Sequence, residues 1–81
     1  MDEELVYNIT TIVNTFIYNK DIRAISNKDS LLVLQVDDWS GRVSKKYTFD
    51  GIEANLVRFG LILDDYSISN DVLTLVIKTN G

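Results

Sequence analysis

Cysteine, histidine and proline are all absent from this sequence of 81 residues. Without cysteine or histidine, the chain cannot form disulfides, thiol nucleophiles, zinc sites of the Cys/His kind or a Ser-His-Asp triad. The side chains left for chemistry are carboxylates, hydroxyls, three arginines, five lysines and four tyrosines. We therefore predict that the protein is not an enzyme and that it has no cofactor and no metal site.

Glycine is scarce as well, so no segment has the composition of a linker. Hydrophobic residues make up 46% of the chain and charged residues 25%, a balance typical of folded proteins. A domain of this size buries about 60% of the surface that its unfolded chain exposes. We predict a single domain over residues 1–81.

Long apolar runs are also missing. The longest run spans about four residues, at positions 31–34, whereas a transmembrane helix needs roughly 20. The first residues are acidic, where a secretory signal would be basic. We therefore expect a soluble cytoplasmic protein that does not bind a membrane.

The net charge of −4 disfavours nucleic acid as a partner, because non-specific binding depends on basic side chains that displace counterions from phosphates. Arg42, Lys45, Lys46 and Tyr47 form a small basic and aromatic cluster that would suit a single strand. On alternating faces of a strand, these charges would more simply be solvated. We predict a protein partner with a basic surface and no direct contact with nucleic acid.

The segment 5–17 has the apolar spacing of an amphipathic helix. Its apolar residues form one helical stripe, made of Leu5, Val6, Ile9, Ile12, Val13, Phe16 and Ile17. Many residues here are β-branched and would also suit a strand. The length of the segment, the acidic residues at positions 2–4 and Lys20 near the far end favour a helix with a stabilised dipole.

The middle of the chain predicts strands joined by tight turns. We predict strands at 21–26 and 31–36, with a turn at 27–30 between them. After a turn at 39–42, residues 43–49 alternate between apolar and polar in the manner of a returning strand. Residues 31–49 are therefore expected to form a hairpin.

A second helix and a second hairpin are predicted from residue 50 onward. Asp50 and Glu53 have the spacing of a capping box, and Gly60 is placed to end the helix. Two strands follow at 61–68 and 72–79. The predicted fold is α+β, in the order α-β-β-β-α-β-β, with an antiparallel sheet of about five strands and two helices on one face.

Two stretches of this sequence nearly repeat each other: "LQVDDWS" at 34–40 and "LILDDYS" at 61–67. Each places two aspartates and an aromatic residue after an apolar strand. The likeness is explained either by an internal repeat or by convergence, because strand ends often carry acidic residues that prevent edge pairing. Adjacent aspartates in a strand point to opposite faces unless the backbone bends. A magnesium or calcium ion would therefore need one carboxylate from each pair.

These stretches supply the predicted partner-binding site. Tryptophan, tyrosine and arginine dominate binding hot spots, and Trp39 beside a turn is either a contact residue or a ring folded back over its own hairpin. The predicted site comprises Asp37, Asp38, Trp39, Arg42, Asp64, Asp65 and Tyr66.

The pattern of residues 31–36 with Asp37 and Asp38, the return at 43–49 and the helix at 50–60 resembles the small acidic anti-CRISPR proteins of phages that infect Gram-positive bacteria. The resemblance implies that carboxylates imitate DNA phosphates and occupy the basic cleft of an RNA-guided DNA nuclease. Asp37, Asp38, Asp64 and Asp65 would be those carboxylates.

The sequence therefore predicts a small acidic protein-binding module, a phage-type inhibitor of a host protein. One alternative is a cation-dependent enzyme. The other is a structural or assembly protein that forms homo-oligomers. Such a protein would self-associate through a sheet edge or through the polar face of the first helix, where Tyr7 and Tyr18 lie among threonines and asparagines.

Overall fold

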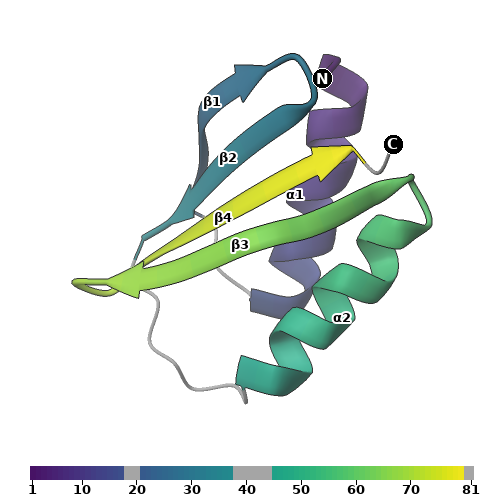
Figure 1. Cartoon of the computed structure of the whole chain (residues 1–81). Coiled ribbons are helices and arrows are strands. Elements are labelled where there is room, and N and C mark those ends of the chain that lie inside the picture. Colours follow the sequence, from purple (N-terminus) through teal and green to yellow (C-terminus); the bar gives the residue numbers. More distant parts are fainter. Residues whose placement is uncertain (18–20, 38–44, 80–81) are drawn as a thin grey trace.

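The computed structural model describes residues 1–17, 21–37 and 45–79. Two helices cover one face of a four-stranded sheet, whose strands run in the order β1-β2-β4-β3 with every neighbouring pair antiparallel (Figure 1). The elements are α1 (Glu3–Ile17), β1 (Ile22–Lys28), β2 (Leu31–Val36), α2 (Lys45–Val57), β3 (Leu61–Ser69) and β4 (Val72–Thr79). The α+β class and the antiparallel sheet are confirmed.

Helix α1 forms where its apolar spacing predicts. Ile9, Val13 and Ile17 are buried on the face that meets the sheet. Asp2 begins the helix, because its Oδ1 accepts a hydrogen bond of 2.8 Å from the N–H of Leu5. An aspartate cap also lies at the positive end of the helix dipole, so the helix start is stabilised twice.

The predicted hairpin over residues 31–49 is wrong. Tyr47 and Phe49 lie in α2, and β2 pairs with β1 on one side and β4 on the other. Phe49, Ile52 and Leu56 are buried on one side of this helix, at a helical spacing that extends the pattern expected only from residue 50. The sheet has four strands among the described residues, and the order is α-β-β-α-β-β. Residue 43 lies outside the described ranges.

The end of α2 is confirmed, whereas its start is not. Asp50 and Glu53 lie inside the helix, so they do not form the predicted capping box. Gly60 has a φ of 71° and closes the helix, with its N–H donating to the carbonyl of Val57 at 3.0 Å. Within the described residues, neither helix has the length and hydropathy needed to cross a membrane.

The core lies between the sheet and the helices. Alternate residues of the two central strands face it, and all are fully buried: Leu32, Leu34, Val36, Leu73, Leu75 and Ile77. The opposite sheet face has no covering element among the described residues (Figure 1). Strands β1 and β3 form the two sheet edges.

Candidate functional site

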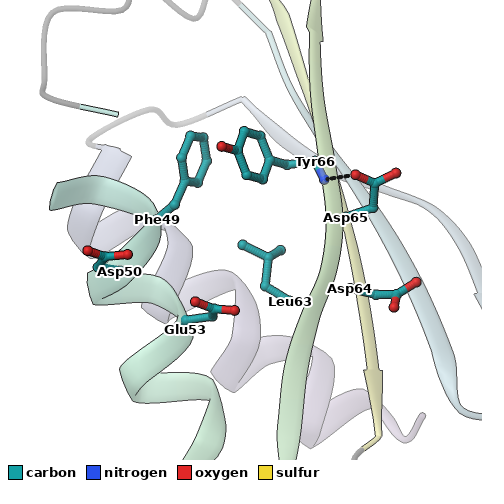
Figure 2. Close-up of a pocket in the computed structure, with 7 residues that line it drawn as sticks. All are labelled: Phe49, Asp50, Glu53, Leu63, Asp64, Asp65 and Tyr66. Carbon is teal, nitrogen blue, oxygen red and sulfur yellow. Dashed lines mark hydrogen bonds between the residues drawn. The ribbon is translucent and has the colours of Figure 1, made fainter. Parts of the chain in front are cut away.

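A β-bulge in β3 fixes the direction of its two aspartates. Leu63 pairs with Ile77 and Asp65 with Val76, so Asp64 is an extra residue in the strand. Both aspartate side chains consequently point away from α2 (Figure 2). Adjacent aspartates would point to opposite faces of a regular strand, and the bulge is the backbone bend that turns this pair to one side.

Neither of these carboxylates is free of contacts. Asp64 forms an ion pair of 3.1 Å with the Nζ of Lys78 on the neighbouring strand. The Oδ1 of Asp65 accepts a hydrogen bond of 2.8 Å from the N–H of Tyr66. Both residues are exposed, so solvent screens the ion pair between Asp64 and Lys78 and makes it weak. A cationic group of a partner could therefore displace Lys78 at little cost.

A hollow of about 370 Å³ lies between α2 and β3, and we call it the α2–β3 groove. It is lined by Phe49, Asp50, Glu53, Leu63, Asp64, Asp65 and Tyr66 (Figure 2). The rings of Phe49 and Tyr66 stack at its upper end, with centroids 4.0 Å apart and planes at 19°. Glu53 reaches from the helix toward Leu63 on the strand. The groove therefore combines an aromatic wall with the carboxylate of Glu53, while the carboxylates of Asp64 and Asp65 lie on the other side of β3.

The burial of the two stacked rings differs. Phe49 is 5% exposed and belongs to the core, whereas Tyr66 is 46% exposed. The tyrosine ring thus stacks on the phenylalanine while about half of the Tyr66 residue surface meets solvent. A fixed, partly exposed tyrosine beside carboxylates suits a guanidinium or ammonium group, which is attracted both by the ring face and by the acids.

The two near-repeats do not form a common surface. Val36 and Ile68 both pair with Leu73, so Asp37 lies just beyond Ile68 along the sheet and two strands away from β3. With strand spacing of about 4.8 Å and a rise of about 3.3 Å per residue, the Cα atoms of Asp37 and Asp65 are roughly 16 Å apart. Asp37 instead forms an ion pair of 3.0 Å with Arg23 of β1.

The other predicted site residues fall into two groups. Asp64, Asp65 and Tyr66 line the α2–β3 groove. Asp38, Trp39 and Arg42 lie outside the described residues. Within the described part of the chain, no group of three acidic side chains converges closely enough to hold a metal ion.

Sequence reasoning missed the half of the groove that comes from α2. Phe49 was expected in a strand, and Asp50 and Glu53 were expected at a helix start. The signal available in the sequence was the helical spacing of Phe49, Ile52 and Leu56. A helix over these residues places Asp50 and Glu53 on one turn.

Comparisons with protein-family models, with curated proteins and with solved structures found no match for this chain. Its function must therefore be argued from the α2–β3 groove and from the sheet edge beside it.

Proposed function

We propose that the protein is a non-enzymatic binding module whose α2–β3 groove takes a basic segment of another protein. The observation that carries the proposal is the half-exposed Tyr66, whose ring stacks on Phe49 in a groove that the acidic residue Glu53 also lines. An arginine of the partner would stack on the tyrosine and donate hydrogen bonds to Glu53.

The charge of the groove selects among partner classes. Four acidic residues contribute to its walls, Asp50, Glu53, Asp64 and Asp65, and their negative charges would repel nucleic-acid phosphates. They would also speed the encounter with a basic surface, because opposite charges steer diffusing partners together. A protein with a basic surface is therefore the partner class that this groove fits best.

An inhibitor of a host protein that binds nucleic acid, such as a phage-type inhibitor of a CRISPR nuclease, is the proposed biological role. A cleft that grips nucleic acid is rich in arginine and lysine, the side chains that this groove suits. The carboxylates that we assign to such a cleft are those of β3 and α2, in place of the pair at residues 37 and 38.

Affinity capture with matched charge variants tests the proposal. Purified protein is used as bait in a bacterial lysate, beside a Glu53→Gln variant and a Glu4→Gln control. Both substitutions remove one negative charge from an exposed helix position, but only Glu53 lines the groove. We expect the partner to be lost with Glu53→Gln and retained with Glu4→Gln. Equal recovery by both variants contradicts the assignment of the groove.

Self-association is a second candidate, favoured by the opposite charges of the two sheet edges. β1 carries Arg23 and Lys28, whereas β3 carries Asp64 and Asp65. Pairing of one edge with the other would join copies head to tail and build open-ended assemblies. Light scattering on the purified protein distinguishes the candidates, since a monomer excludes this one.

A further inference from the structure

We propose that the basic segment binds as an added strand along the free edge of β3, with alternate side chains entering the α2–β3 groove. This inference rests on the proposed function and adds the conformation of the bound segment. In binding of this kind, main-chain hydrogen bonds supply affinity and the pockets for alternate side chains supply specificity.

The hydrogen-bond pattern of the sheet shows which backbone groups of β3 are available. The N–H of Thr79 donates to the carbonyl of Ser30 at 3.0 Å, so the backbone groups of Thr79 point toward β2. Antiparallel strands alternate these directions at every residue, which turns Leu73 and Leu75 toward β2 as well. Their partners on the other side, Ile68 and Tyr66, therefore direct their backbone groups outward.

One of these outward groups already has a partner. The N–H of Tyr66 donates to the carboxylate of Asp65. Within the described residues, the carbonyl of Tyr66 and both backbone groups of Ile68 have no hydrogen-bond partner at this edge. They form a short template after the bulge, where β3 is regular again from Asp65 to Ser69.

The side chains of an added strand would meet acids on both faces. Those on the helix side would reach the ring of Tyr66 and the carboxylate of Glu53, which line the groove. Those on the other side would lie beside Asp65, whose side chain points away from α2 (Figure 2). An extended segment with alternate arginines is therefore expected in the register that places them in the groove, where the ring of Tyr66 and the acid of Glu53 occur together.

A second copy of the chain fits this edge less well than a basic segment of another protein. Antiparallel pairing of two β3 edges would bring acidic side chains of both copies together, and like charges on neighbouring strands are destabilising. Pairing with β1 of a second copy would use Arg23, which already forms an ion pair with Asp37 at 3.0 Å.

Peptides with N-methylated backbones test the added strand. The probe is a short acetylated peptide in which arginine alternates with threonine, titrated into the full-length protein at low salt and followed by calorimetry. One variant is N-methylated at its arginines and another at its threonines. In an added strand, the N–H groups of only one set point toward β3, whichever way the strand runs. We expect one variant to lose at least tenfold in affinity and the other to bind like the parent.

A matched pair of proline variants tests the same edge from the protein side. Ile68→Pro removes an outward N–H from β3 and leaves its pairing with β4 intact, since an edge strand tolerates proline at such a position. Ala24→Pro makes the same change at β1, because Ala24 pairs with Leu34, whose backbone groups point toward β4. We expect Ile68→Pro to weaken peptide binding at least tenfold and Ala24→Pro to leave it unchanged.

The outcomes separate this inference from the proposed function. If the parent peptide does not bind, the proposed function fails for basic segments. If it binds and both N-methylated variants lose equally or not at all, the added strand is refuted while the proposed function stands. If the protein forms a multimer that Ala24→Pro dissociates, the β3 edge belongs to self-association and the inference is overturned. The titrations with N-methylated peptides still test the added strand if the Ile68→Pro variant fails to fold.

Discussion

Replacing Gly51 by alanine should destabilise the protein, although alanine is the better helix former. Gly51 lies in α2, where glycine costs about 1 kcal/mol relative to alanine. A Cβ at this position would overlap Cε1 of Phe16 and lie 2.8 Å from Cδ1 and Cζ of the same ring. That ring is partly buried against the core and meets Tyr47 edge-on, with centroids 6.3 Å apart, so moving it to admit the Cβ would disturb both contacts.

The expected size of the effect follows from two opposing quantities. Overpacking a core contact costs typically about 1–3 kcal/mol. Subtracting the helix-propensity gain of about 1 kcal/mol leaves a net loss of up to roughly 2 kcal/mol for Gly51→Ala. Urea denaturation followed by far-ultraviolet circular dichroism measures this loss as a lower midpoint at an unchanged slope.

Two further variants separate the opposing quantities. Ala54→Gly, at an exposed position of the same helix, should cost about 1 kcal/mol and measures the propensity alone. In a Phe16→Leu background the overlap is relieved, so Gly51→Ala should then raise stability by about the same amount. A stabilising Gly51→Ala in the native background would refute the claim that this glycine is required for the approach of α1 to α2.

Other predictions concern single groups. Thr48→Val should raise stability by about 1 kcal/mol in the same urea assay, because the Thr48 hydroxyl is fully buried and has no hydrogen-bond partner among the described residues. Asp71→Gly should stabilise by up to about 1 kcal/mol, since Asp71 has a φ of 62° in the turn between β3 and β4; an unchanged thermal midpoint would contradict this. Asp2→Ala should cost about 1 kcal/mol through the lost helix cap. A double-mutant cycle on Arg23 and Asp37 should give a coupling below about 1 kcal/mol, because both side chains are substantially exposed.

The parts of the fold that could be predicted are those with long, unambiguous periodicity. Residues 5–17 repeat at the helical period over several turns, and residues 61–79 form two strands around a turn, as the sequence predicts. The prediction failed at residues 45–49, where a few alternating residues match a strand and a helix equally well. Over so short a span, the choice is made by tertiary contacts.

Topology explains why the hairpin prediction failed. β4, from the end of the chain, lies beside β2 and occupies the place that a returning strand at 43–49 would have taken. A pairing between segments so far apart in sequence leaves no local pattern, whereas the β1–β2 turn does: its residues are of the turn-forming kind, and Asp29 has a φ of 54°. Local signals therefore identified this turn but could not identify the neighbour of β2.

The candidate site was predicted in part for the same reason. Asp64, Asp65 and Tyr66 stand out in the sequence because they follow an apolar segment and nearly repeat residues 37–39. The bulge that turns both aspartates to one side has no sequence signature, and the groove behind them depends on where α2 packs against β3. The near-repeat at residues 34–40 suggested a shared surface that the strand order rules out for Asp37.

The bulge and the two acids of β3 also have a protective explanation, because exposed edge strands commonly carry charges and bulges that prevent edge-to-edge aggregation. Protection accounts for Asp64 and for the capture of the Tyr66 N–H by Asp65. It does not account for a hollow behind the strand, or for a tyrosine held half exposed against Phe49. Protection and binding are compatible if the β3 edge rejects most strands but accepts a basic one. A cationic side chain that attracts the Asp65 carboxylate would release the Tyr66 N–H, which could then donate to the added strand.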